Sequence, residues 1–135
     1  AHMEPAREVG GDLYDLLALP GGLLLFGVAD VTGKGAPAGL TMARCFGLVR
    51  AAARMAQGLP DPAVLMAMAN DDLAAENDDM TFVTALFGVL DPATGEGRLC
   101  NAGHEAPIRV RAGGGVVMEG AHIEPALGVM EGFPY

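Results

Sequence analysis

Two aspartates, Asp12 and Asp30, stand where the chain can bring backbone segments close together. Asp12 follows a Gly-Gly pair, and Asp30 ends an apolar run just before the glycine-rich residues 31–35 (VTGKG). Burying a carboxylate at such a strand end is costly, and two close carboxylates raise each other's pKa, unless a cation compensates them. A hard divalent ion such as Mg²⁺ or Mn²⁺ would satisfy both through carboxylate, carbonyl and water oxygens. The backbone carbonyl of Val31 is a further candidate ligand.

The residues alone leave a simpler interpretation open, in which Asp12 and Asp30 only end strands and cap turns. Asp15 either supports a metal site from outside or faces solvent. A phosphate-binding loop is a poor fit, because GxxxxGK[ST] is absent and Lys34 precedes Gly35 rather than Ser or Thr.

One histidine, His104, stands in a short motif that begins at Asn101 and reads NAGH. It could act as a general acid or base, since the pKa of histidine lies near working pH. The alternative is that it fixes a loop through hydrogen bonds. Cys45 and Cys100 form no CxxC pair, so we expect buried small apolar side chains in a reducing cytosol and hence a cytoplasmic protein.

A β-hairpin is the first element expected to position these residues. Residues 7–19 and 23–30 flank a Pro-Gly-Gly turn, and the second run is almost wholly apolar. That pattern predicts a central strand with both faces covered. Together with the later elements, it predicts an α+β fold with helices on antiparallel sheet. The later elements are helices from 36 to about 58 and from 61 to about 77, then strands over 80–90, 97–102, 108–111 and 116–119.

Length and composition indicate a single globular domain. The chain has 135 residues, of which 51% are hydrophobic and 19% charged. Its formal net charge of -9, with Lys34 as the single lysine, argues against nucleic acid as a partner. The chain is also short of basic residues, so a metal would have to supply the positive charge if the substrate carried a phosphate group. No apolar run approaches the ~18 residues of a membrane span, and residues 1–3 (AHM) are expected to be an expression-tag remnant.

Four segments in order resemble the SpoIIE-like (RsbU-type) branch of the metal-dependent serine/threonine protein phosphatases, the PPM family of the type 2C superfamily. The resemblance implies an incomplete phosphatase 2C-like α-β-β-α sandwich with antiparallel sheets and a helix pair. It also implies that residues 4–135 are the N-terminal two-thirds of the phosphatase domain, truncated at the C-terminus. The segments are 9–15 (VGGDLYD), 28–38 (VADVTGKGAPA), 80–91 (MTFVTALFGVLD) and 101–107 (NAGHEAP), and residues 124–129 also fit.

The same resemblance implies roles for the candidate metal ligands. Asp30 would be the carboxylate shared by two Mn²⁺ or Mg²⁺ ions, Val31 would give its carbonyl to one ion, and Asp12 would join the metal and water shell. Two such ions activate a water that attacks phosphorus, so no catalytic protein nucleophile is expected. Asn101 and His104 belong to the family motif without an assigned role.

The resemblance also implies a partner and a departure from the family pattern. The partner would be a phosphorylated regulatory protein, with a STAS-domain anti-anti-sigma factor in a bacterial partner-switching pathway as the candidate, and a homodimer is left open. The family's later Asp-Gly and Asp-Asp ligands are absent, since no aspartate follows Asp91. We therefore expect impaired hydrolysis of phosphoserine and phosphothreonine. The alternative is a non-catalytic phosphatase-fold interaction module.

Overall fold

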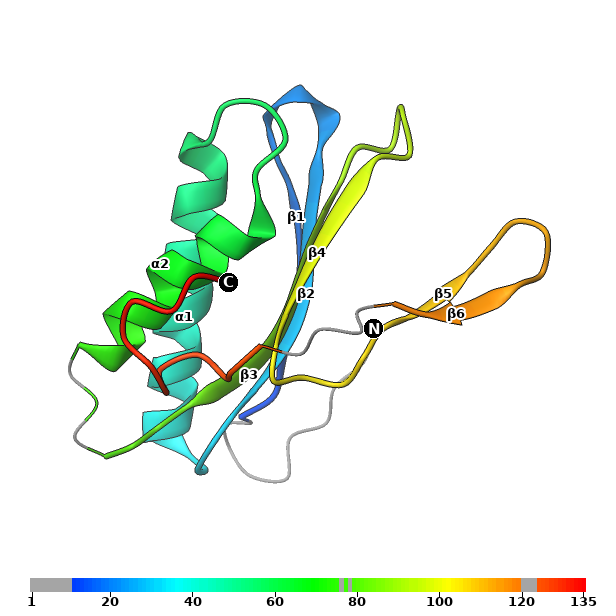
Figure 1. The fold of residues 1–135 in the computed structure, drawn as a ribbon. Helices are drawn as coiled ribbons and strands as arrows, with labels where there is room; N and C mark the ends of the chain where they lie inside the picture. The colour runs from blue at the N-terminus through cyan, green and yellow to red at the C-terminus, as the bar shows by residue number, and fades with distance from the viewer. Residues whose placement is uncertain (1–10, 76, 78, 120–123) are drawn as a thin grey trace.

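Two helices cover one face of a four-stranded antiparallel sheet, and a separate two-stranded sheet completes the fold (Figure 1). This computed structural model describes residues 11–75, 77, 79–119 and 124–135. It confirms the predicted α+β class, with antiparallel sheets and a helix pair. The elements are β1 (Leu13–Ala18), η1 (Pro20–Gly22), β2 (Leu24–Val31), α1 (Ala36–Met55), α2 (Pro62–Ala74), β3 (Val83–Leu90), β4 (Gly97–Ala102), β5 (Ile108–Val110) and β6 (Val116–Met118).

The predicted hairpin is the β1–β2 pair, whose register runs from Leu13 opposite Ala29 to Ala18 opposite Leu24. Its turn is a single 3₁₀ turn with Gly21 at φ 77°, a backbone conformation that favours glycine. Strand β2 also pairs with β3, which pairs with β4, so β2 lies inside the sheet as predicted. The part of the first predicted strand before residue 11 lies outside the described residues.

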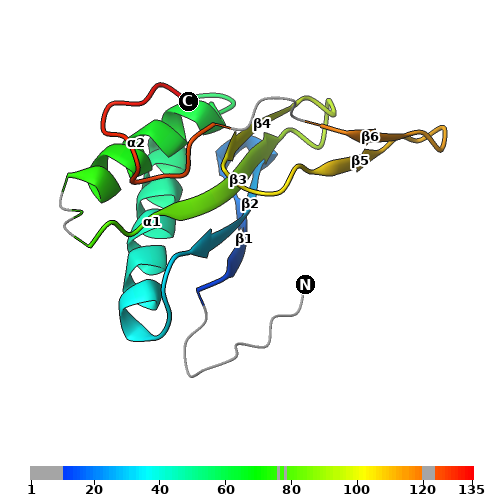
Figure 2. The ribbon, with the colours of Figure 1, turned by 60° about the horizontal axis from the view of Figure 1, so that its bottom comes forward.

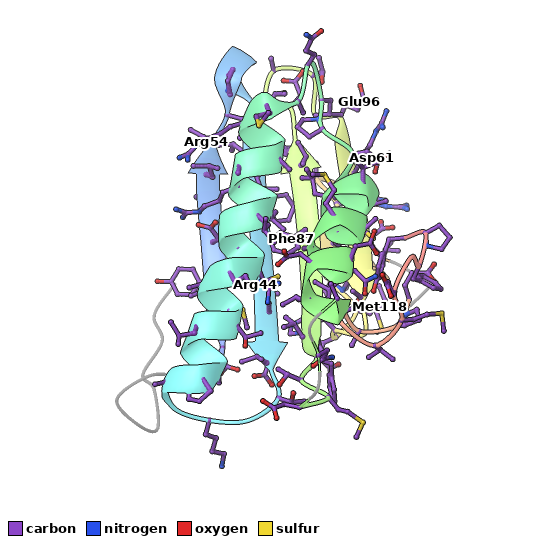
Figure 3. The ribbon with its side chains drawn as sticks, turned by 90° about the vertical axis from the view of Figure 1, so that its left-hand side faces the viewer. Arg44, Arg54, Asp61, Phe87, Glu96 and Met118 are labelled. Carbon is purple, nitrogen blue, oxygen red and sulfur yellow. The ribbon has the colours of Figure 1, made fainter. Side chains whose placement is uncertain are left out.

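The hydrophobic core lies between the sheet and the helices. Phe87 of β3 is fully buried and packs against Phe46 of α1, with ring centroids 5.0 Å apart. Figure 3 views the helix layer in front of the sheet, with Phe87 behind it. Arg44 of α1 ties the helices together, because it forms an ion pair with the Asp72 carboxylate and donates to its backbone carbonyl.

The other face of the sheet, here called the outer face, is open, so the expectation that both faces of β2 are covered is wrong. Side chains of a strand alternate between faces, and every second residue of β2 points away from the helices. Apolar side chains remain solvent-accessible there, with exposed fractions of 46% for Tyr14, 67% for Leu16, 38% for Val28 and 45% for Leu99. An almost wholly apolar strand thus does not guarantee two covering layers.

Strands β5 and β6 form a hairpin that extends away from the main body (Figure 2). Both strands were predicted, and the structure places them in a sheet of their own. Two apolar pairs, Ile108 with Met118 and Val110 with Val116, face each other in register, and all four residues are exposed. Among the helices that the structure describes, neither is long and apolar enough to cross a membrane.

The C-terminal segment, residues 124–135, runs along α2 and is held there by a buried side chain. Asn70 of α2 is 0% exposed. Its Oδ1 accepts from Gly128 N at 2.9 Å and from the Tyr135 hydroxyl at 3.3 Å, while its Nδ2 donates to Met130 O at 2.8 Å. These bonds satisfy an amide that would otherwise be costly to bury.

Gly27→Ala should destabilise the fold, because a Cβ at Gly27 of β2 would clash with Cδ1 of the fully buried Phe87 ring and lie 2.9 Å from the backbone oxygen of Leu86. We expect a loss of about 1–3 kcal/mol in the free energy of unfolding, measured by urea denaturation. Gly47→Ala is the matched control, since Gly47 lies within α1 and a Cβ there meets nothing within 4 Å. That change should raise stability by up to about 1 kcal/mol. Equal effects of the two changes would contradict the packing argument.

Candidate metal and phosphate site

Asp12 and Asp30 meet at the open end of the β1–β2 pair. The outermost register pair joins Leu13 to Ala29, and the two aspartates are the next residues outward along the two segments. The side-chain hydrogen bond and the charge of Asp12 both act on the Asp30 carboxyl. The structure therefore brings together the two carboxylates that the sequence singled out.

Gly11 lets the backbone of the first segment approach this pair. A Cβ added at Gly11 would lie 3.2 Å from the Val31 carbonyl oxygen and 3.3 Å from Asp30 Oδ1. Both oxygens thus face the same small space beside Gly11, and any side chain there would crowd them. Val31 itself is 3% exposed, with its side chain in the core.

The pKa of Asp30 reflects lost hydration and the repulsion between the two neighbouring carboxylates. The pKa of Asp30 is raised above its ordinary value, first by lost hydration against the sheet and then by the hydrogen bond and charge of Asp12. His104 opposes this rise, because its charge lowers the pKa of Asp30. A divalent cation between the two carboxylates would offset their repulsion.

His104 reaches this site through Thr84, a residue that the sequence analysis did not single out. Thr84 pairs with Asp30 across β2 and β3, and its hydroxyl lies 3.0 Å from Nδ1 of His104. The same hydroxyl is 3.4 Å from the backbone carbonyl oxygen of Asp30. The sequence alone could not identify Thr84 as a neighbour of Asp30, because that requires the register of the β2–β3 pair.

Asn101 fixes the backbone on which His104 stands. Asn101 is only 5% exposed. Its Oδ1 accepts a hydrogen bond from His104 N at 2.8 Å, and its Nδ2 donates one to His104 O at 2.9 Å. Gly103 between them has φ 69°, where glycine is favoured, and Ala126 packs closely against it. The loop-fixing contribution in this motif therefore comes from Asn101, while the His104 ring is directed to Thr84.

Asp15 does not face solvent, and it does not join the metal site. Its side chain is 7% exposed and lies on the sheet face that the helices cover, three residues from Asp12 and so on the opposite face. Arg50 of α1 binds it with two parallel hydrogen bonds, of which Nε to Oδ2 is 2.6 Å. The hydrogen bonds from Arg50 hold the pKa of Asp15 below its ordinary value. Asp15 thus anchors helix to sheet.

The residues present fit part of a hard-cation site. Asp12, Asp30 and the Val31 carbonyl offer oxygen donors of the type that Mg²⁺ and Mn²⁺ prefer. Across the described ranges, no three His, Cys, Asp or Glu side chains gather closely enough to hold a metal ion. Water and further ligands would have to complete the coordination.

The sequence profile of the family described as "Stage II sporulation protein E (SpoIIE)" matches residues 20–135. The chain belongs to the SpoIIE family. Protein IcfG of Synechocystis sp. is 30% identical to it over 158 aligned positions, which cover 96% of this chain and 24% of that protein.

Solved structures agree with this family. The RsbU and RsbW domains of Rv1364c from Mycobacterium tuberculosis match with a TM-score of 0.76 and 27% identity, over 96% of this chain and 36% of that one. The PP2C phosphatase domain of SpoIIE from Bacillus subtilis matches with a TM-score of 0.74 and 20% identity, over 95% of this chain and 36% of that one. RsbX in complex with magnesium matches with a TM-score of 0.73 and 19% identity, over 93% of this chain and 57% of that one. The last two show a shared PP2C-like fold. The SpoIIE-family chain spans well under two thirds of each of these proteins.

Replacing Arg50 by Met should destabilise the protein, because the buried Asp15 carboxylate loses its partner. We expect a loss of about 1–3 kcal/mol at neutral pH, measured by thermal or urea unfolding. The folded pKa of Asp15 is lowered from 3.8, so the loss should be full above that pH and fade as the pH falls below it. A loss that persists unchanged at pH 2 would contradict the ion-pair argument.

Replacing Asp12 by Asn should stabilise the metal-free protein. The folded pKa of Asp30 is raised from 3.8, so its ionisation penalises the folded state at higher pH, and removing the Asp12 charge relieves that penalty. With EDTA present, the melting temperature should rise at pH 7, and the gain should vanish near pH 3. Asp79→Asn, at an exposed aspartate, is the control and should show no such gain. A lower melting temperature at pH 7 would contradict the repulsion.

Proposed function

We propose that this SpoIIE-family chain provides the Asp12–Asp30 part of a phosphatase active site. The reaction is metal-dependent hydrolysis of phosphoserine or phosphothreonine on a regulatory protein. The observation that carries the proposal is the convergence of Asp12, Asp30 and the Val31 carbonyl beside Gly11. Family membership and the phosphatase fold of the solved relatives support it.

Each ligand has a distinct task in this proposal. Asp30 would be the carboxylate shared by the ions, the Val31 carbonyl would contribute to holding one of them, and Asp12 would join the shell of metal and water. Two Mn²⁺ or Mg²⁺ ions, when bound, supply an activated water and neutralise phosphoryl charge. The magnesium complex of RsbX, a protein of similar fold, is consistent with a divalent ion of this type.

The remaining predictions concern the setting of the reaction. A phosphorylated partner in a partner-switching pathway accords with the likeness to RsbU, and the STAS-domain factor and self-association stay predictions. A cytoplasmic location accords with two free, buried thiols, Cys45 and Cys100. The assignment of residues 4–135 to the N-terminal two-thirds of the domain also stays a prediction.

Asp30→Asn tests the proposal directly. Mn²⁺ titration by calorimetry should show binding to the parent chain and a loss of affinity of more than about tenfold in the variant, because even outer-shell substitutions cost ~10–100-fold. Hydrolysis of p-nitrophenyl phosphate with Mn²⁺ should be slow in the parent and absent in the variant. Asp79→Asn should match the parent in both assays.

The opposite results separate the two candidate functions. If the parent binds no Mn²⁺ at millimolar concentrations, the non-catalytic interaction module is favoured. If the variant hydrolyses as fast as the parent, Asp30 has no part in the reaction. Fast turnover by the parent chain would show that Asp12, Asp30 and the Val31 carbonyl suffice as protein ligands.

A further inference from the structure

We propose that His104 binds the substrate's phosphoryl group at the Asp12–Asp30 site, as a hydrogen-bond donor through Nε2. The inference rests on the proposed function and extends it to a residue whose role the family resemblance leaves open. The ligand class is a phosphate monoester, whose anionic oxygens accept hydrogen bonds from neutral or charged donors.

His104 stands beside the two carboxylates through its contact with Thr84. Thr84 pairs with Asp30 in the β2–β3 register, both residues point to the outer face of the sheet, and the Thr84 hydroxyl lies 3.0 Å from Nδ1 of His104. A phosphate held at the two carboxylates through cations would therefore lie next to an imidazole that can donate a hydrogen bond.

Contacts within the protein fix the orientation of the His104 ring. Asn101 holds the His104 backbone from both sides, with bonds of 2.8 and 2.9 Å, and Gly103 adopts the φ of 69° that the turn needs. Thr84 then holds the ring itself, at 3.0 Å from Nδ1. A buried amide, a left-handed glycine and a hydroxyl thus fix one imidazole next to Asp30, which is the arrangement expected of a preorganised binding group.

The contact with Thr84 determines which ring nitrogen of His104 carries the proton. A threonine hydroxyl has one proton to donate, and it lies 3.0 Å from His104 Nδ1 but 3.4 Å from Asp30 O. In the neutral imidazole, the shorter separation favours donation to Nδ1, so Nδ1 accepts and the ring proton resides on Nε2; the charged imidazolium carries a proton on Nε2 as well. A donor nitrogen then remains for an anionic oxygen, and a metal ion is not expected to bind there because Nε2 has no free lone pair.

The tautomer is tested by NMR. In the ¹⁵N-labelled chain, long-range ¹H–¹⁵N correlations should show the His104 proton on Nε2, with the signals assigned by their loss in His104→Gln. Thr84→Val should abolish the preference for that tautomer, whereas Thr41→Val, which removes a helix hydroxyl bonded to Pro37 O, should leave it unchanged. A proton on Nδ1 in the parent chain overturns the proposal.

Ligand affinity is tested with inorganic phosphate as the probe. Gln can place a donor nitrogen near the position of Nε2, and Asn only near that of Nδ1. In the presence of Mn²⁺, we expect His104→Asn to weaken phosphate binding about tenfold and His104→Gln to recover most of it, since a hydrogen bond to a charged group is of that size. Mn²⁺ affinity should be the same in all three proteins, and circular dichroism should show each of them folded.

The outcomes separate this inference from the function on which it rests. Equal phosphate affinity in the Asn and Gln variants, with Mn²⁺ binding intact, overturns the role of His104 alone. Loss of Mn²⁺ affinity in step with phosphate affinity also overturns it, because His104 would then act on the metal site. Failure of the parent chain itself to bind Mn²⁺ overturns the proposed function and this inference together.

Discussion

The repulsion between two carboxylates at one end of a hairpin is the constraint around which the site is organised. Antiparallel pairing places Asp12 next to Asp30, and the lack of a side chain at Gly11 lets them share a small space with the Val31 carbonyl. The fold accepts an unfavourable charge pair there, which raises the pKa of Asp30. Perturbed pKa values of this kind cluster at functional sites.

Alternation along the strands places the candidate site residues on the outer face of the sheet and the residues that pack against the helices on the other face. Residues that point to the outer face include Asp30 and Thr84, whereas Asp15 and Phe87 point to the helices. The ion pair of Asp15 with Arg50 therefore stabilises the helix layer without entering the site. Because both sets lie on the same strands, the rigidity of the packed face also fixes the position of the candidate ligands.

Much of the fold could be predicted from the sequence, because its signals are local. Apolar runs around Pro-Gly-Gly predicted the β1–β2 hairpin, and helical spacing with Asp61 before Pro62 predicted α2. The close approach of the two candidate metal ligands followed from that hairpin. What the sequence did not reveal depends on contacts between distant residues: the Thr84–His104 bond requires the β2–β3 register, and the open outer face depends on which layers are present. The covered position of Asp15 could have been predicted, since residues 12 and 15 of one strand face opposite sides.

The side-chain amide of Asn70 connects α2 with residues 124–135, which are far away in the sequence. Its oxygen and nitrogen are occupied by Gly128, Met130 and Tyr135, so release of residues 124–135 would break three hydrogen bonds of the Asn70 side chain. We therefore expect α2 and the C-terminal segment to open as one cooperative unit rather than to fray separately. Leu127, bonded to Val83 at the start of β3, extends that unit to the strand that carries Thr84.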